Sequence, residues 1–290
     1  MNTTNRSRLF LSLSMVIFGT LAPFVRNISV SSGELALYRA VLAAVFIGSF
    51  LLLTKQKAPF PAPGKELYLL LFSGIAMGFN WILLFEAYKY TTVAIATLSY
   101  YFAPVIVTLV CPLFFKEKLT KKQILCFVMS TLGLTLVIGI TNLGSGGNNV
   151  IGIGFGLGAA VLYATVILLN KFIKGVTGIH RTFLQFLAAI AVLIPYVLFT
   201  GGMHLGNLDL TGWGCLLIVG LIHTGITYCL YFTSLKELSG QEAAILSYLD
   251  PLVAVLIGVL VLKEPFSVQQ LVGGLLILGF TLLNELNTGK

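Results

Sequence analysis

Asp250 is the first residue whose type and position could support chemistry, because it stands in a long apolar stretch immediately before Pro251. If that stretch is a membrane helix, a rise of 1.5 Å per residue places the carboxyl group roughly 12 Å deep. An acid at that depth is costly and marks a functional candidate. It could bind an amino group, take up a proton for coupling, or act structurally by hydrogen bonding to a kinked backbone. His223, in another apolar stretch, is a second candidate for coupling or for structural packing.

Two prolines interrupt apolar stretches that are otherwise helical in pattern. Pro104 and Pro251 each lack a backbone N–H and clash with the carbonyl four residues earlier, which belongs to Tyr100 or Ser247. A freed carbonyl within a membrane helix is tolerated where it lines a cavity or finds another partner. We predict a hinge or gating role for both prolines, with a static kink as the alternative.

Polar and aromatic side chains recur at helical spacing near these prolines. One stripe runs from Thr97 through Tyr101 to Pro104, and another runs from Thr224 to Tyr231. Lipid would reject such stripes, so they face a cavity or form hydrogen bonds between helices. A cavity lined in this way suits a mid-sized organic metabolite with an apolar body and polar ends. The predicted substrate-binding residues are Asn80, Trp81, Thr97, Tyr101, Thr224, Thr227, Tyr228, Tyr231, Ser247 and Tyr248.

Motifs for enzymatic or cofactor chemistry are missing from the sequence. It contains no Gly-rich phosphate loop, no HExxH motif and no Ser-His-Asp-like cluster. The four cysteines have neither metal-ligand nor disulfide spacing, and the three histidines are scattered. We therefore predict a protein that is not an enzyme and that uses no cofactor and no metal.

The composition predicts how these residues are held. Of 290 residues, 57% are hydrophobic and 10% are charged, whereas soluble domains carry about 25% charged residues. Ten apolar runs are long enough to cross a bilayer as helices, and they are too long and continuous for barrel strands. The runs are 9–25, 34–54, 66–87, 91–115, 122–141, 151–170, 182–200, 211–232, 242–262 and 267–284. The predicted fold is therefore an all-α integral membrane protein with ten transmembrane helices.

The positive charges predict the orientation in the membrane. With a cytoplasmic N-terminus, 14 Lys and Arg residues fall in inside loops and ends, and three fall outside. This asymmetry places both termini in the cytoplasm. The net charge of +8 is then a topological signal, and we expect no nucleic-acid partner. Arg39 lies inside the second run, where snorkelling to the outer surface or a structural tie would accommodate it.

An internal repeat divides the chain at a shift of 147 residues. The aligned identities include Tyr101 with Tyr248, Pro104 with Pro251, Gln123 with Gln270, and the Lys-Glu pair at 116–117 with that at 263–264. Each copy holds five runs, an odd number, so the second copy, residues 146–290, must be inverted relative to the first, residues 1–145. Inverted repeats are the architecture of many secondary transporters, with the substrate site between them.

These stretches resemble the EamA-type domain of the drug/metabolite transporter superfamily. The resemblance rests on residues 87–137, on residues 235–283 with SYLDPLVAVLIGVLVLKEPFSVQQLVGGLLILGFTLL at their end, and on LYRAVLAA at 37–44. It implies a ten-helix metabolite carrier whose cavity is lined mainly by spans 1, 3, 4, 6, 8 and 9, with spans 5 and 10 at the periphery. The family pattern usually has Glu before the second proline, where this chain has Asp250.

The predicted function is secondary active or facilitative transport of a small organic metabolite by alternating access. An amino acid or related compound, moved outward, fits the resemblance. The alternatives are a proton-coupled multidrug or amine exporter, and a non-transporting membrane scaffold or sensor. The expected partners are the solute and the lipid bilayer of a bacterial-type cytoplasmic (inner) membrane, and the expected state is a monomer or weak homodimer.

Overall fold

The protein is all-helical throughout the part of the chain that the structure describes. A computed structural model describes residues 3–55, 64–115, 120–138, 148–176, 178–235, 237–238, 243 and 246–288, and none of them forms a strand. The helices are α1 (Thr3–Gly19), α2 (Leu21–Arg26), α3 (Ser32–Leu53), α4 (Lys65–Tyr90), α5 (Val93–Tyr100), α6 (Ala103–Phe115), α7 (Lys121–Ile138), α9 (Asn148–Phe172), α10 (Gly178–Thr200), the 3₁₀ turn η1 (Leu205–Asn207), α11 (Leu210–Leu217), the π-helix η2 (Ile218–Ile226), α12 (Thr227–Ser234), α14 (Leu249–Leu260) and α15 (Val268–Thr288).

Seven segments within the described residues are long and apolar enough to cross a membrane. They are Thr3–Arg26, Ser32–Leu53, Lys65–Tyr90, Val93–Val110, Asn148–Phe172, Gly178–Thr200 and Leu210–Ser234. Leu249–Leu260 and Val268–Leu283 are apolar but shorter. A multi-pass helical membrane protein is thus confirmed, whereas a count of ten crossings and an inverted repeat stay predictions.

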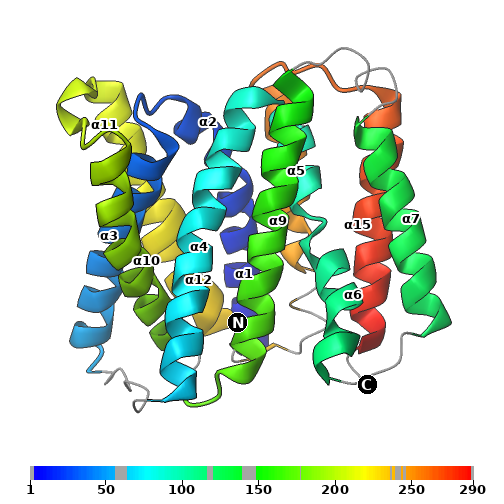
Figure 1. Cartoon of the computed structure of the whole chain (residues 1–290), viewed down its shortest axis with the longest axis horizontal. Helices are drawn as coiled ribbons and strands as arrows, with labels where there is room; N and C mark the ends of the chain where they lie inside the picture. Colours follow the sequence, from blue (N-terminus) through cyan, green and yellow to red (C-terminus); the bar gives the residue numbers. More distant parts are fainter. Residues whose placement is uncertain are drawn as a thin grey trace.

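The helices form a bundle in which segments distant in sequence are neighbours (Figure 1). α4 packs against α9 and α10, α3 packs against α10 and η2, and α1 packs against α12 and α14. α5 contacts both α9 and α14, so it lies in the centre of the bundle. α7 and α15 pack against each other at one edge, which is the peripheral place that the family resemblance implies for spans 5 and 10.

The helix starts carry caps that the sequence supplies. Ser31 caps α3 in a capping box with Glu34, since each side chain bonds the other residue's backbone N–H. α7 and α15 begin with matching boxes at the repeat spacing. In both boxes the Gln side chain accepts from the cap N–H at 2.8 Å, and the Gln N–H donates to the cap hydroxyl at 3.2 Å; the boxes are Thr120 with Gln123 and Ser267 with Gln270.

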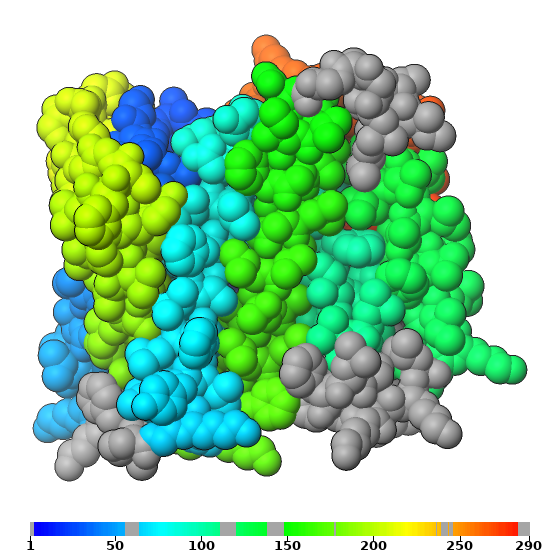
Figure 2. Space-filling model, viewed as in Figure 1, coloured from blue at the N-terminus to red at the C-terminus, as the bar shows by residue number. Residues whose placement is uncertain are grey.

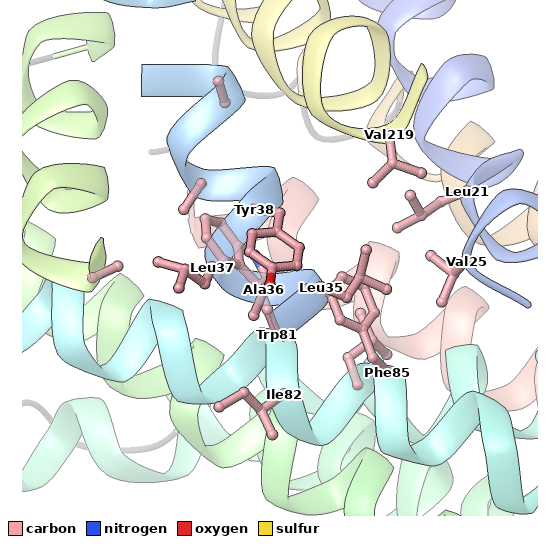
Figure 3. Packing of buried hydrophobic residues seen from close by; sticks show 14 of the residues in the cluster. Leu21, Val25, Leu35, Ala36, Leu37, Tyr38, Trp81, Ile82, Phe85 and Val219 are labelled. Atoms are coloured by element: carbon pink, nitrogen blue, oxygen red, sulfur yellow. The ribbon is translucent and has the colours of Figure 1, made fainter. Parts of the chain in front are cut away.

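A main core cluster joins helices from both halves of the chain. Leu21 and Val25 of α2, Leu35 of α3, Phe85 of α4 and Val219 of η2 are all buried and meet in one cluster (Figure 3). On the face shown in Figure 2, α4 and α9 lie side by side between α10 and α7. Burying apolar surface between helices from both halves holds the central polar residues in place.

Glycines let the edge pair α7 and α15 approach closely. A Cβ atom on Gly273 would lie 2.5 Å from the carbonyl oxygen of Gly133, and one on Gly133 would lie 2.6 Å from that of Gly273. Small residues at membrane helix crossings allow this backbone contact. The two glycines therefore fix the crossing point of the pair.

The π-helix η2 is the least regular part of the bundle and was not predicted. Its wider turn brings residues five apart onto one face, and Gly220 and Gly225 both press against α3. A Cβ atom on Gly220 would lie 2.5 Å from Leu42, and one on Gly225 would lie 2.9 Å from Phe46. π-Helical segments occur often at functional sites.

Candidate functional site

Two backbone breaks lie at positions related by the repeat spacing. α5 ends at Tyr100 and α6 begins at Ala103, and Tyr101 between them has φ −70° and ψ 5°. Tyr248 precedes α14 with φ −72° and ψ −8°. Each proline therefore lies in the first turn of a new helix, where its missing N–H costs little. Pro104 and Pro251 start helices in this structure instead of kinking continuous ones.

Asp250 follows the second break and is bound by a residue of the first. The Tyr101 hydroxyl donates to Asp250 Oδ2 at 2.6 Å, which joins α5 to α14 across the sequence halves. Gly19 of α1 packs against the backbone of Asp250: a Cβ atom on Gly19 would lie 2.7 Å from the Asp250 carbonyl oxygen. Asp250 thus lies where spans 1, 4 and 9 of the predicted topology meet.

Arg39 carries the second charge of the region; it is buried and does not snorkel to the surface. It is 4% exposed, and its Nε donates to Thr224 Oγ1 of η2 at 2.7 Å. Its Cζ lies 4.8 Å from the centroid of the Trp81 ring and 5.6 Å from that of Phe85. Trp81, predicted to bind substrate, packs edge-on against Phe186 and forms a platform for this cation.

Tyrosines fill the space around the two charges. The side chains of Tyr88, Tyr100 and Tyr228 interact electrostatically with both Arg39 and Asp250. Tyr100 also stacks on Tyr163 of α9, with ring centroids 5.3 Å apart. We give the name charged core to the two charged residues and the tyrosines around them: Arg39, Asp250, Tyr88, Tyr100, Tyr101, Tyr163 and Tyr228.

Several predicted binding residues serve the backbone in this conformation. Asn80 donates to the carbonyl oxygen of Ala159 at 2.6 Å and ties α4 to α9. Thr224 and Thr227 donate to carbonyl oxygens five residues earlier, at 2.8 and 2.7 Å. Ser247 donates to the Ala243 carbonyl at 2.8 Å. Their polar groups therefore stabilise and connect helices, which is the alternative to cavity lining that the sequence left open.

The remaining predicted residues are aromatic or buried. Tyr228 packs edge-on against Phe186 at 5.4 Å, and Tyr231 packs against Phe232 at 5.0 Å. Thr97 is 3% exposed and Tyr248 is 8% exposed. The structure thus brings Trp81, Tyr101, Tyr228 and Asp250 into one region and places Tyr231 further along α12.

His223 of η2 contacts residues at the start of α2 and in α2 itself. Its Nε2 is 3.1 Å from Thr20 Oγ1, its Nδ1 is 3.4 Å from the Ile218 carbonyl oxygen, and its ring packs on Phe24 at 5.0 Å. Both ring nitrogens therefore have partners between α2 and η2, an arrangement that suits packing.

A polar bridge joins several helices at one end of the bundle. We call this the α2 end, because α2, the start of α5 and the loop after α14 meet there at the top of Figure 1. Arg26 forms an ion pair with Glu264 at 2.5 Å and donates to carbonyl oxygens of Tyr88 and Thr91. Glu264 also accepts the N–H of Val93, the first residue of α5, at 2.8 Å. Its counterpart in the repeat, Glu117, lies outside the described residues.

Sequence reasoning missed Tyr88, Tyr100 and Tyr163, and it assigned no binding role to Arg39. Tyr100 precedes Tyr101 and faces α9, so the i, i+4 stripe did not include it. The i, i+4 pattern also fails at η2, where the turn is wider. Tyr88 does lie seven residues after Trp81, which is a helical spacing that could have identified it.

Two pockets formed by described residues lie away from the charged core. An apolar groove of about 530 Å³ between α4 and α9 is lined by residues that include Phe72, Phe79 and Leu162. A much smaller pocket lies between α6, α7 and α15, near Thr108 and Ser130. Neither contains a predicted binding residue.

Comparisons with known proteins agree with the arrangement. The EamA-like transporter family matches residues 6–139 and again residues 150–285. The uncharacterized transporter YxxF of Bacillus subtilis (strain 168) is 33% identical over 252 residues, covering 84% of this chain and 78% of that protein. An uncharacterized transporter of Archaeoglobus fulgidus is 29% identical over 275 residues, covering 93% of each. A crystal structure with 17% identity superposes with a TM-score of 0.63 over 95% of this chain and 96% of that one, which shows a shared fold.

Proposed function

The chain belongs to the EamA-like transporter family and is a membrane transporter, and from this premise we propose that it moves a small organic metabolite by alternating access. The solute we propose is an amino acid or related compound, moved outward. The driving force is the proton gradient or the gradient of the solute itself. The moving parts are two inverted five-helix repeats, residues 1–145 and 146–290.

The pair of matched backbone breaks is the observation that carries this proposal. Tyr101 and Tyr248 have nearly the same backbone angles and interrupt a helix at matching places, each three residues before a proline. Broken helices at the interface of two repeats are typical of substrate sites in secondary transporters. The Tyr101–Asp250 hydrogen bond links the two breaks, so a change in backbone conformation at one break would be transmitted to the other.

The packing supports two repeats related by a pseudo-two-fold axis. Under the repeat spacing, the contact of α4 with α9 corresponds to that of α12 with α1, and the contact of α10 with α4 corresponds to that of α3 with η2. The contacts of α5 with α14 and of α7 with α15 correspond to themselves. The equal capping boxes of α7 and α15 follow the same relation.

The orientation we propose rests on charge. α1 begins and α15 ends toward the same end of the bundle, opposite the α2 end (Figure 1). The excess of Lys and Arg predicts that this shared end faces the cytoplasm of a bacterial-type inner membrane. The α2 end then faces outward, and the bridge of Arg26 and Glu264 closes the outer side.

A proton-coupled amine exporter is the second candidate, and Asp250 favours it. A carboxyl group beside a tyrosine hydroxyl inside a membrane bundle can hold either a proton or an organic cation. Dependence on a pH gradient separates this candidate from a carrier driven by the gradient of its solute. A scaffold or sensor would move no solute at all.

The test is transport by the full chain in proteoliposomes, with a radiolabelled panel of amino acids and amines. Accumulation or efflux of a panel member above empty vesicles is expected, and a pH gradient either stimulates it or does not. If no solute moves with or without the gradient, the transporter mechanism is wrong and the scaffold reading gains support.

Proline variants test the breaks themselves. Pro104→Ala and Pro251→Ala each allow a continuous helix across the break, so we expect transport to fall at least about tenfold while the protein still folds. Pro195→Ala is the matched control, because Pro195 lies inside α10, away from the breaks. Equal transport in all three variants would contradict a hinge at the two sites.

A further inference from the structure

Arg39 is a buried cation for which the structure describes no balancing anion. It is 4% exposed, and none of the described carboxylates lies within ion-pair distance of it. Thr224 provides a neutral oxygen for Nε, and Trp81 provides a ring face. Among described residues, the two terminal guanidinium nitrogens have no hydrogen-bond partner. A charge held in this way is costly inside a membrane unless a ligand compensates it.

The guanidinium is held rigidly, which argues against an accidental burial. Gly220 and Gly225 bring η2 against α3, so the Thr224 hydroxyl reaches Nε at 2.7 Å. That hydroxyl donates its own proton to the Val219 carbonyl at 2.8 Å and therefore accepts from Arg39. Trp81 is fixed in turn by Phe186 at 5.2 Å. Nε is occupied by Thr224 and the guanidinium lies over the Trp81 and Phe85 rings, which leaves an edge with several N–H donors.

The open edge belongs to the same region as Asp250. Arg39 is 4% exposed, so it does not face the lipid, and Tyr88, Tyr100 and Tyr228 interact electrostatically with both Arg39 and Asp250. Arg39 and Asp250 do not form an ion pair with each other; Asp250 bonds Tyr101 instead. Two opposite charges that are not paired with each other thus lie among the same aromatic rings.

We propose that Arg39 binds the carboxylate group of the transported solute. Guanidinium presents its donors in a planar fork that matches the two oxygens of a carboxylate, which a lysine does not. The aromatic lining then takes the apolar body of the solute. This inference rests on the proposed transport function and deepens it, because it makes a carboxylate a requirement for tight binding.

The test compares probes that differ by one group, with the full chain in detergent and in proteoliposomes. The probes are L-phenylalanine and L-leucine, their amines without the carboxylate (2-phenylethylamine and 3-methylbutylamine), and their acids without the amino group (3-phenylpropionate and 4-methylpentanoate). For the wild type, we expect at least one amino acid or acid to bind about 10- to 100-fold more tightly than the matching amine.

Variants of Arg39 should remove this preference without unfolding the protein. In Arg39→Gln, the ratio of affinities between the carboxylate probe and the amine should fall to within about threefold. Arg39→Lys keeps the charge without the fork and should retain part of the ratio. Arg26→Gln, which removes an arginine that is already paired with Glu264, should keep the full ratio. Thermal unfolding without ligand shows which variants fold.

The outcomes separate this proposal from the transport function on which it rests. If an amine binds and moves as well as its carboxylate partner, or if Arg39→Gln keeps the ratio, Arg39 is a structural residue and transport stands. If Arg39→Gln does not fold and Arg39→Lys keeps the full ratio, the fork is unnecessary and the proposal is overturned. If no probe binds or moves, both proposals fail together.

Discussion

Replacing Glu264 by glutamine should loosen the α2 end of the bundle. The carboxylate of Glu264 pairs with Arg26 at 2.5 Å and accepts the Val93 N–H at 2.8 Å. Glutamine retains an acceptor for the Val93 amide but removes the negative charge that faces Arg26. The substitution therefore removes the ion pair between α2 and the end of α14, while it leaves the cap of α5 in place.

The free-energy cost of removing the Arg26–Glu264 ion pair depends on how deeply the pair is buried. An exposed ion pair contributes about 0.2–1 kcal/mol, and breaking a buried pair costs about 3–5 kcal/mol. The Glu264 side chain is 9% exposed and the Arg26 side chain is 31% exposed, so the bridge lies between these limits. A value of about 2 kcal/mol multiplies the ratio of open to closed α2 ends by about 30.

The assay is the labelling of a single cysteine placed behind the bridge. Ala94, 1% exposed in α5, is replaced by cysteine in a chain whose four native cysteines are changed to serine. While the open state is rare, its population sets the rate at which a membrane-impermeant maleimide reacts. Glu264→Gln should raise that rate about 30-fold. Glu86→Gln breaks an exposed pair with Lys89 inside α4 and should change it less than about twofold. Equal rates in the two variants would refute the idea that the bridge holds this end closed.

Two further substitutions test single contacts. Tyr101→Phe removes the hydroxyl that donates to Asp250 at 2.6 Å, a charge-assisted bond worth about 1.5–3 kcal/mol. Transport in proteoliposomes should therefore fall, and its pH profile should change. The control Tyr90→Phe, at the exposed end of α4, should leave the pH profile of transport unaltered. Gly273→Ala places a Cβ atom 2.5 Å from a glycine carbonyl of α7 and should cost about 1–3 kcal/mol, lowering the thermal midpoint in detergent. Gly279→Ala, on the same helix with open space around it, should leave the midpoint the same or raise it, and the opposite order would contradict the close crossing.

Much of the fold was predictable because the long helices correspond to continuous apolar runs in the sequence. The run 66–87 appears as Lys65–Tyr90, and the run 182–200 appears inside Gly178–Thr200. The breaks were located through proline, whose steric effect is local and does not depend on tertiary packing. What proline did not reveal is that the helix restarts before it, at Ala103 and Leu249.

The site was harder to predict because its key contacts come from packing between distant segments. Nothing within residues 218–226 marks a π-helix; the wider turn is matched to Leu42 and Phe46 of α3. Hydroxyl groups that seemed free for a ligand, such as that of Thr227, bond to the backbone that this turn exposes. For Arg39 the sequence left both snorkelling to the surface and a structural tie open, and only the packing shows that Trp81 and Thr224 hold it inside.

Features that recur in both repeats and features that occur in only one have different roles in the proposed transporter. The features that recur at the repeat spacing, the backbone breaks and the capping boxes, concern the motion and stability of helices. The two charges of the charged core do not recur: at the shift of 147 residues, Asp250 corresponds to Ala103 and Arg39 corresponds to Phe186. A solute without two-fold symmetry can be oriented only by residues that break the symmetry of its site. The charges at Arg39 and Asp250 are therefore where specificity should reside, and the matched breaks are where the alternation between access states should arise.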